Sequence, residues 1–463
     1  MRLYNTLSHK TEEFIPYNES EVTLYTCGPT VYHYAHIGNM RNYINEDILE
    51  KALNYLGYKV KRCMNITDVG HLTSDSDSGD DKMLKGAKRE NMSVLDIAKK
   101  YTDAFKEDCK KLNIKWPEIV VPATKEIAEY IKMIEKLLTK GYAYKSGGNI
   151  YFDITKLEDY YKLTNHKIDE MVVGVREGVE EDKSKKNQGD FALWFTKSKF
   201  DDQELKWESP FGIGYPGWHI ECSCIAIKYL GEYLDIHCGA VDNIFPHHTN
   251  EIAQSEAYLG HKWCKYWFHT EHLKNASGKM SKSKGDFLTI DSLIEKGYNP
   301  LQFRYMCLSS HYRKGLIFDF DSLNNSKEAY IKLKNKIKNI KDEGEFDNDK
   351  FNEYNQNFKK ALENDLNTSL SLTTLYDVIK SEISGKTKLA LIKEFDKVLS
   401  LDLLKKDEIS EELKKYIENK IKERNLYKQN KEYEKADEIR NELKMKNIII
   451  KDTKEGTTFE IQG

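Results

Sequence analysis

The sequence predicts an α/β protein built on a parallel sheet, followed by a helical region and a small α+β unit. Three features predict this arrangement. A strand, a turn and a helix follow one another between Val22 and Leu56, and a second strand at 58–68 completes a parallel βαβ unit. From Ser322 onward the chain is rich in Lys, Glu, Asn and Leu and reads as helical, and residues 447–461 predict a terminal hairpin.

Length and composition exclude several classes of protein. A chain of 463 residues is too long for one hydrophobic core, so we expect two or three domains. Charged residues make up 32% of it, and it shows neither a signal peptide nor a membrane-spanning apolar stretch, which predicts a cytoplasmic protein without membrane contact. Its eight cysteines are scattered, which favours metal binding or burial over disulfides. The net charge of −3 argues against a protein that coats DNA.

Residues 26–41 combine a thiol with a predicted phosphate-binding turn. The run Val22–Tyr25 is β-branched and aromatic, as in a buried strand, and apolar residues recur at helical spacing after Gly38. A strand, a Gly/Pro turn and a helix N-terminus form an anion site, because free backbone N–H groups and the helix dipole point into the turn. Cys27 stands at the end of this strand, beside the predicted anion site.

Further elements follow from apolar periodicity and turn residues. We expect helices at 93–112 and 125–140, one ending at Leu230, one starting at Pro246 and one or two within 410–446, and strands at 142–153, 191–195 and 233–238. Two stretches, 69–79 and 177–188, are dominated by small or charged residues and are predicted loops. We place a domain boundary near Phe320, where the helical composition begins.

Four residues form a candidate metal site: Cys27, Cys222, His247 and Glu251. The first three fall at edges of predicted sheet elements, where they could converge, and thiolate, imidazole and carboxylate are zinc donors. Pro246 fits a first helical turn, so His247 and Glu251 would share a helix face. Buried cysteines and a surface His–Glu pair are the simpler alternative. Spacing alone leaves four rivals open for the same roles, namely His219, Cys224, Cys238 and His248.

Two further motifs predict contacts to phosphate. His36-Ile37-Gly38-Asn39 stands at a helix start, and Lys279-Met280-Ser281-Lys282-Ser283 lies in a small, polar, basic stretch. Each motif is weak alone, since His-x-Gly occurs by chance and a basic stretch is often an exposed linker. Together they supply the donors and positive charge that in-line attack on a nucleotide α-phosphate needs.

On these residues the chain resembles the cysteinyl-tRNA synthetases, a family of class I aminoacyl-tRNA synthetases, over essentially its whole length. The resemblance is carried by Thr26–Tyr32, His36–Asn39, Asn65–Asp68, Gly217–Cys222, Phe245–His248 with Glu251, and Lys279–Ser283. The chain departs from the family at Asn39, where the HIGH pattern ends in His, and at Thr249, where an acid is common. None of these departures removes a proposed metal ligand.

The resemblance implies a division of the chain into five parts. A Rossmann-like catalytic domain would consist of two halves, 1–115 and 207–284, with a connective insertion at 116–206 between them. Residues 285–320 would contact the tRNA stem, 321–400 would form a helical tRNA-binding bundle, and 401–463 would form a C-terminal anticodon-recognition domain.

The resemblance also implies an activity: ATP-dependent ligation of L-cysteine to tRNA(Cys) through a cysteinyl-adenylate, by a monomer. One zinc ion per chain, held by Cys27, Cys222, His247 and Glu251, would bind the substrate sulfur and so select cysteine over serine. Magnesium would accompany ATP. Catalytic roles are implied for His36, Asn39, Lys279 and Lys282, ATP contacts for His36, Gly38, Asn39 and Lys282, and an amino-acid pocket for Thr67, Trp218 and Asp242.

Two other functions are compatible with parts of this pattern. A related ligase could use cysteinyl-adenylate to acylate an amino sugar or another amine, but it would not need the long Lys-rich helical tail. A zinc-stapled RNA-binding protein without catalysis would have little use for both phosphate motifs. Cysteine-dependent exchange of pyrophosphate with ATP would rule out this second alternative.

Overall fold

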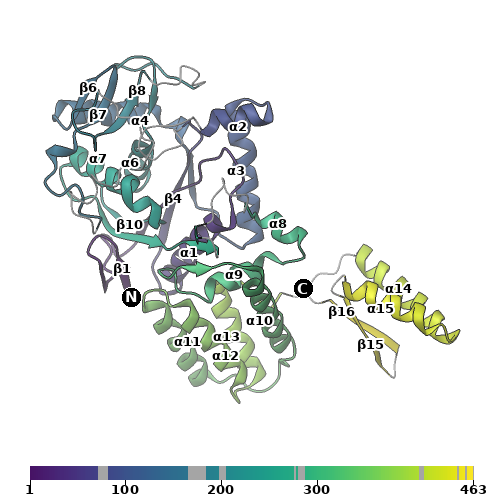
Figure 1. Cartoon of the computed structure of the whole chain (residues 1–463). Coiled ribbons are helices and arrows are strands. Elements are labelled where there is room, and N and C mark those ends of the chain that lie inside the picture. Colours follow the sequence, from purple (N-terminus) through teal and green to yellow (C-terminus); the bar gives the residue numbers. More distant parts are fainter. Residues whose placement is uncertain are drawn as a thin grey trace.

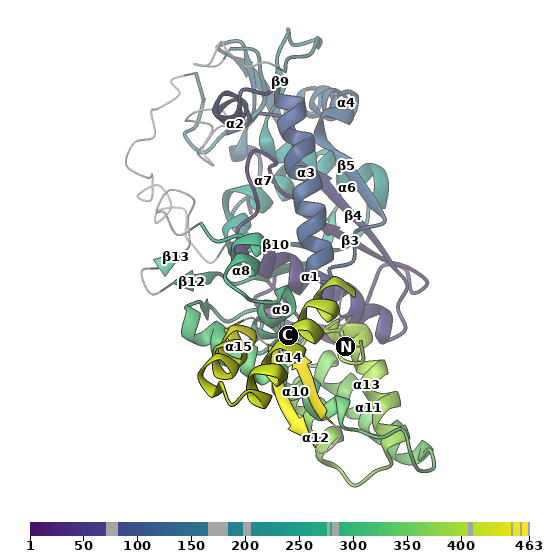
Figure 2. The ribbon, with the colours of Figure 1, turned by 90° about the vertical axis from the view of Figure 1, so that its right-hand side faces the viewer.

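A computed structural model describes residues 1–70, 82–164, 184–197, 205–275, 278–279, 287–405, 411–445, 448–453 and 456–461. Figure 1 shows a sheet-containing part above a helical bundle, and a C-terminal unit at the right of the view. Turned by 90°, the molecule is elongated, with α3 running alongside strands β3, β4 and β5 (Figure 2). The predicted loop at 69–79 lies almost entirely outside the described residues, as do 177–183 of the other predicted loop.

The centre of the molecule is a parallel sheet in the strand order β11-β10-β3-β4-β5. Its strands are β3 (Val22–Thr26), β4 (Val60–Ile66), β5 (Ile119–Pro122), β10 (Leu234–Ala240) and β11 (Cys264–Thr270). Tyr25 lies opposite Cys63 on one side and His237 on the other, so the strands end at one edge. The predicted parallel sheet is thereby confirmed. Strand β3 continues to β4 on one side and neighbours the later strand β10 on the other, and such a position is where open α/β sheets bind ligands.

Among the described residues, six helices accompany this sheet. They are α1 (Ile37–Tyr55), α2 (Lys82–Glu90), α3 (Val94–Lys111), α4 (Ile127–Thr139), α6 (Trp218–Leu230) and α7 (Thr249–Leu259). Three of them, α1, α6 and α7, carry predicted site residues. Ser93, at the predicted start of its helix, caps α3 by accepting a hydrogen bond from the Asp96 N–H. Helical backbone begins at Pro246, as expected: within the turn η4 (Ile244–His248) only Phe245 has non-helical angles (φ −138°, ψ 133°), as a residue before proline prefers, and α7 follows directly.

A second, antiparallel sheet in the order β6-β7-β8-β9 lies at the top left of Figure 1. Its strands are β6 (Ala143–Ser146), β7 (Asn149–Phe152), β8 (Phe191–Phe195) and β9 (Tyr215–Pro216), which include the strands expected at 142–153 and 191–195. It shares a hydrophobic core with α4 and α6. A small sheet in contact with α1 joins β12 (Leu273–Asn275), β13 (Gly278–Lys279) and β14 (Leu316–Ile317). At the N-terminus, β1 (Arg2–Asn5) pairs with β2 (Lys10–Glu13).

The helical region begins with α8, before the boundary expected near Phe320, and shares its core with the parallel sheet. Its helices are α8 (Ile290–Glu295), α9 (Pro300–Leu308), α10 (Phe320–Lys338), α11 (Asn348–Glu363), α12 (Thr368–Lys380) and α13 (Gly385–Leu399). Leu53 of α1 and Phe358 of α11 belong to one hydrophobic cluster. Figure 1 shows the bundle below the part of the molecule that contains the parallel sheet.

The C-terminal unit has a core of its own. It contains α14 (Glu411–Gln429), α15 (Tyr433–Met445) and the expected hairpin, β15 (Ile448–Thr453) with β16 (Gly456–Ile461). Its hydrophobic core contains Ile417, Ile421, Ile439, Leu443, Ile448 and Ile450. Within the described ranges, no helix has the length and apolar character needed to cross a membrane.

Candidate active site

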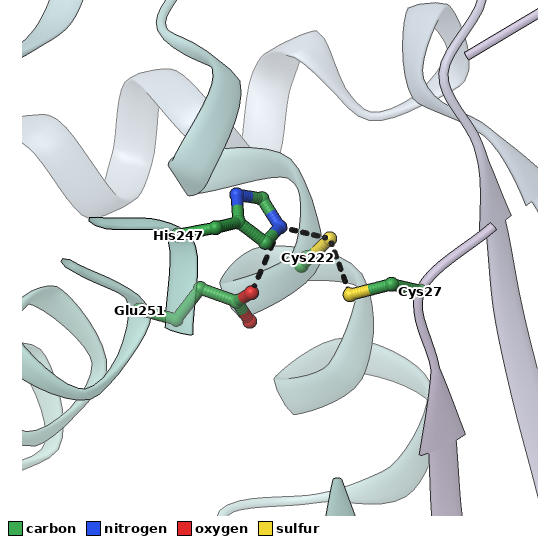
Figure 3. A group of neighbouring side chains, drawn as sticks. All are labelled: Cys27, Cys222, His247 and Glu251. Atoms are coloured by element: carbon green, nitrogen blue, oxygen red, sulfur yellow. Dashed lines mark hydrogen bonds and ion pairs between the residues drawn. The ribbon is translucent and has the colours of Figure 1, made fainter. Parts of the chain in front are cut away.

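The four predicted metal donors lie together at the carboxyl edge of the parallel sheet (Figure 3). Cys27 follows β3, Cys222 lies in α6, His247 in the turn before α7, and Glu251 in the first turn of α7. The two sulfur atoms are 3.9 Å apart, Sγ of Cys222 is 3.5 Å from Nε2 of His247, and that nitrogen is 3.0 Å from Oε1 of Glu251. All four ligand atoms lie within 4.8 Å of one another.

These separations suit a tetrahedral zinc ion. With Zn–S bonds of about 2.3 Å and Zn–N bonds of about 2.0–2.1 Å, tetrahedral geometry puts two sulfurs about 3.8 Å apart and a sulfur and a nitrogen about 3.6 Å apart. Cys222 and Glu251 are buried, and Cys27 is partly buried. Oε1 of Glu251 is buried, and it lies 3.0 Å from Nε2 of His247, on the side of the cluster. A buried carboxylate oxygen in that position is suited to a cation.

Neighbouring side chains orient two of the donors. Nε2 of His237 lies 2.8 Å from Oε2 of Glu251, which leaves Oε1 facing the cluster. Nδ1 of His219 lies 2.9 Å from Nδ1 of His247, so the other ring nitrogen of His247 faces the two thiols. Such contacts to the outer atoms of metal ligands fix ring orientation and tautomer.

The rival residues separate into three positions. His219 lies behind His247, on the side away from the thiols. Cys224 points elsewhere, with Sγ 3.7 Å from the carbonyl of Glu129 and 3.6 Å from the sulfur of Met133, and Cys238 belongs to no metal-binding group among the described residues. His248 remains a rival, because its Nε2 is 3.3 Å from Sγ of Cys27. A second four-donor group contains Cys27, His237, His248 and Glu251.

The electrostatics distinguish the two neighbouring histidines. Burial alone would lower the pKa of His247, but the Glu251 carboxylate and the Cys222 sulfur raise it to about 10. Burial and the surrounding histidines instead hold the pKa of His248 well below its usual range, so this ring is neutral. Burial opposes ionisation of Cys222 too, yet the contact with Cys27 and the proximity of His247 lower its pKa, whereas burial raises that of Cys27.

Two histidines around the cluster were not predicted from the sequence. His237 lies within β10, and His269 lies within β11, where its Nε2 is 2.8 Å from Nδ1 of His248. His237 could have been suspected from the sequence, because it stands near the end of the strand predicted at 233–238. No such signal existed for His269, because the strand that carries it was not expected.

The turn after Cys27 requires glycine and is connected to Thr67 through hydrogen bonds to Asn65. A Cβ atom at Gly28 would lie 1.6 Å from the carbonyl oxygen of Asn65. The Gly28 N–H donates to Oδ1 of Asn65 (2.8 Å), and Nδ2 of Asn65 donates to Oγ1 of Thr67 (3.0 Å). The Thr67 hydroxyl in turn donates to the buried Glu221 (2.9 Å). The predicted pocket residue Thr67 is therefore held by a buried polar network at the end of β4.

The other two predicted pocket residues lie in different surroundings. The Trp218 ring packs over that of His247, with ring centroids 4.2 Å apart and an angle of 30° between the planes. Asp242 follows β10, and its Oδ1 lies 2.7 Å from Nε2 of His272. Its side chain is 45% exposed, and it belongs to neither four-donor group. The structure thus brings Trp218 into contact with a predicted metal donor, and Asp242 into contact with His272.

The predicted phosphate turn is a capped helix start. His36 is the N-cap of α1: its Nδ1 accepts a hydrogen bond from the Asn39 N–H (3.1 Å), while Oδ1 of Asn39 accepts one from the His36 N–H (3.2 Å). A Cβ atom at Gly38 would lie 2.9 Å from the His36 ring, so position 38 favours glycine while the ring accepts this hydrogen bond. Asn39 thus closes a reciprocal capping box.

The lysine motif is described only in part. The Lys279 backbone lies in β13, opposite Lys274 of β12, and Lys282 lies outside the described residues. Downstream of the motif, the Leu288 carbonyl accepts a hydrogen bond from the Ile37 N–H (2.9 Å). The Phe287 ring also lies beside that of His36, with centroids 6.1 Å apart. The segment that carries the motif therefore returns to the start of α1.

Comparisons with known proteins agree with this geometry. Residues 13–328 match the family described as tRNA synthetases class I (C) catalytic domain. The chain is 44% identical to a cysteine–tRNA ligase of Treponema denticola, over 99% of each chain, and 42% identical to one of Borreliella burgdorferi, over 99% of this chain and 98% of the relative. A structure of Mycobacterium tuberculosis methionyl-tRNA synthetase in complex with methionyl-adenylate shares the fold, with a TM-score of 0.54 and 13% identity over 82% of this chain and 88% of that one.

Proposed function

The chain belongs to the cysteine–tRNA ligase family of class I tRNA synthetases, and we propose that it joins L-cysteine to tRNA(Cys) at the edge of the parallel sheet. The observation that carries this proposal is the group of two thiols, one imidazole and one carboxylate beside the capped start of α1. The substrate carboxylate would attack the α-phosphate of ATP, forming cysteinyl-adenylate and releasing pyrophosphate. The ribose hydroxyl at the tRNA end would then attack the acyl carbon of the adenylate, forming the ester and releasing AMP.

Cys27, Cys222, His247 and Glu251 are the residues that would hold zinc, and their spacing and chemistry fit that ion. When bound there, zinc supplies a soft Lewis acid that prefers the thiolate of cysteine to the hydroxyl of serine. This preference matters because a pocket that relies on shape separates such similar side chains by only about 10–200-fold. Selection by sulfur chemistry would make a separate editing domain unnecessary.

Side chains near the four donors would position the amino acid. Trp218 packs on His247 and would form a wall of the pocket, and Thr67 would contribute its hydroxyl oxygen from the end of β4. Asp242 is a candidate for a contact with the substrate amine or the ribose, from its exposed position after β10. These three assignments depend on the family resemblance as well as on their places at this edge.

The start of α1 and the lysine motif would bind the nucleotide. His36, Gly38 and Asn39 lie at the positive end of α1, where phosphate oxygens are stabilised. Lys279 and Lys282 would stabilise the charge that develops on the departing pyrophosphate. Magnesium would accompany ATP and neutralise part of the charge of its phosphates. The helical bundle and the C-terminal unit would hold the tRNA, and we propose that the enzyme works as a monomer in the cytoplasm.

The test compares two cysteines of the same helix. Cys222→Ser removes a sulfur of the donor group, whereas Cys224→Ser changes a buried cysteine that points toward Glu129 and Met133. We expect the first variant to lose stoichiometric zinc and much of its preference for cysteine over serine in pyrophosphate exchange with ATP. The second should retain both, at some cost in stability.

Two results would contradict the proposal. One is a Cys222→Ser variant with full zinc content and full discrimination against serine. If zinc alone is retained, the double variant Cys222→Ser, His248→Ala shows whether the second donor group holds it. The other is wild-type protein that forms cysteinyl-adenylate but does not acylate tRNA(Cys) transcripts, which would favour an amine acceptor instead.

A further inference from the structure

Arg41 is a buried arginine in the second turn of α1, only 1% exposed. Its guanidinium donates to backbone carbonyls of two distant segments. Nη1 donates to the carbonyls of Glu271 and His272 (2.7 Å to His272), and Nη2 donates to that of Lys314 (2.6 Å) and, at 3.5 Å, to that of His311. Within the described part of the chain, no carboxylate forms an ion pair with Arg41.

Both carbonyls that Nη1 contacts lie directly before strand β12. That strand pairs with β13, whose residue Lys279 lies opposite Lys274. The other end of this segment also reaches α1, because the Ile37 N–H donates to the Leu288 carbonyl (2.9 Å). The first two turns of α1 therefore hold both ends of the segment that contains Lys279, while the same helix begins with the His36 cap.

The segment at 311–318 supports β12 from its other side. The Leu316 N–H donates to the His272 carbonyl (3.0 Å), and the Phe318 N–H donates to the Lys274 carbonyl (2.7 Å). This supporting segment is held by the bundle in turn, since Asp365 accepts a hydrogen bond from the Tyr312 hydroxyl (2.6 Å). Strand β12 thus has few ways to shift relative to α1 as long as Arg41 bridges the two segments.

The chemistry of arginine suits this bridge. Burying a cation is expensive unless its N–H groups find acceptors, and a planar guanidinium can direct several N–H groups at separate carbonyls in fixed directions. A lysine ammonium in the same place is a compact charge on a flexible stem and cannot reproduce the fork. Arg41 therefore contributes the fixed directions of its N–H groups at this position, because all of the acceptors that it contacts are backbone carbonyls.

We propose that Arg41 is a positioning residue for adenylate formation: it fixes the start of β12 against α1 and so sets the place of Lys279 relative to His36. The inference rests on the proposed function, in which both residues act on the phosphates of ATP. A displacement of about 1 Å in such a constellation can lower a rate about 100-fold, even when the altered residue touches no substrate.

The experiment compares Arg41→Lys with Arg304→Lys in the full-length protein. Arg304 is also buried and donates to the backbone carbonyls of Leu112 (3.0 Å) and Leu399 (2.8 Å). It differs in pairing with the Asp47 carboxylate of α1 (2.7 Å), and it donates to no described residue of β12 or of 311–318. Cysteine-dependent pyrophosphate exchange gives kcat and the KM values for ATP and cysteine. Rates are referred to the concentration of zinc-loaded protein.

For Arg41→Lys we expect kcat to fall about 10–100-fold, with zinc content and the KM for cysteine within about twofold of wild type. Arg304→Lys should lower the melting temperature while leaving kcat within about threefold. As a second variant, Arg41→Ala should recover part of its rate when millimolar guanidinium is added, whereas Arg304→Ala should not.

Equal kcat values for the two lysine variants, or an Arg41→Ala variant that guanidinium leaves unchanged, would overturn the positioning role. A wild-type protein without cysteine-dependent exchange would instead overturn the proposed function itself.

Discussion

Asn39 occupies the position where the family's HIGH pattern ends in histidine, and its side chain closes the first turn of α1. Its Oδ1 accepts a hydrogen bond from the His36 N–H, while the His36 ring accepts one from the Asn39 N–H. The departure in sequence thus has a local structural role. Asparagine also retains an N–H donor that could face phosphate, so one residue can serve both the helix and the nucleotide.

Substitution separates these two roles. Asn39→Ala removes the acceptor for the His36 N–H, and we expect it to lower the free energy of unfolding by about 0.5–1 kcal/mol and to raise the KM for ATP. Asn39→Asp replaces the amide oxygen with a carboxylate oxygen, which can still accept the hydrogen bond from the His36 N–H, so stability should be retained. The negative charge of the carboxylate should still raise the KM for ATP. Thermal unfolding and pyrophosphate exchange measure the two effects. An Asn39→Asp variant with unchanged KM for ATP would argue against a phosphate contact at this position.

The four candidate donors were chosen from the sequence with the help of the family resemblance, and the structure brings them together, whereas their surroundings could not be predicted. Cys27 and Cys222 each stand beside a recognisable turn or helix start, and these local signals are enough to place both residues at the edge of the sheet. The contacts of His237 with Glu251, and of His269 with His248, depend on which strands are neighbours. Strand order is a property of the folded chain and leaves no mark at either histidine.

At the scale of elements, local signals predicted β3, β4 and β10 of the parallel sheet and the helices α1, α3 and α7 that follow them, but not β5 or β11. The capping residue Ser93 and the spacing that follows it gave the bounds of α3 almost to the residue. Strand β11 was missed, because its run Cys264–Thr270 mixes apolar, aromatic and charged residues without a clear alternation. The helix start at Pro246 was predicted correctly, because proline fits a first helical turn and keeps the preceding residue, Phe245, extended.

Helix α3 also contains a buried carboxyl group, that of Asp108, whose ionisation lowers the stability of the fold as the pH rises. Burial raises the pKa of Asp108 from its ordinary 3.8 to about 6, although Lys111, at 3.2 Å, opposes the shift. A carboxyl group whose pKa is higher in the folded state stabilises the fold below the unfolded pKa, and this stability is lost as the pH rises through the folded pKa. The shift of about two units corresponds to at most about 3 kcal/mol.

We therefore expect Asp108→Asn to stabilise the protein at pH 8, by about 1–3 kcal/mol, and the gain to disappear as the pH falls from about 6 to about 4. Thermal unfolding across this range measures the difference. Asp103→Asn is the matched control on the same helix, because its side chain is 62% exposed and solvent screens its charge. A stability gain that is equal at pH 4 and pH 8 would contradict the assignment to ionisation of Asp108.

At the scale of the whole molecule, the chain contains two regions that differ in their connection to the site. The helical bundle shares a hydrophobic cluster with α1, and Leu401 and Leu403, which follow its last helix, are buried in that same cluster. The unit at 411–461 has a separate core of isoleucine and leucine side chains. Removing the bundle would expose part of the catalytic core, whereas removing the C-terminal unit would not.

A chain ending at residue 405 should therefore retain cysteine-dependent pyrophosphate exchange within about twofold, because the deleted core contributes nothing to the site. Its charging of tRNA(Cys) should fall, since the deleted unit is proposed to hold the tRNA, and the loss should appear mainly in the KM for tRNA. A chain ending at residue 400 is the control: it also removes Leu401 and Leu403, which are 0% and 2% exposed, and should unfold at a lower temperature. If the chain ending at 405 loses pyrophosphate exchange as well, the C-terminal unit supports the catalytic core, and the separation inferred from the two clusters is wrong.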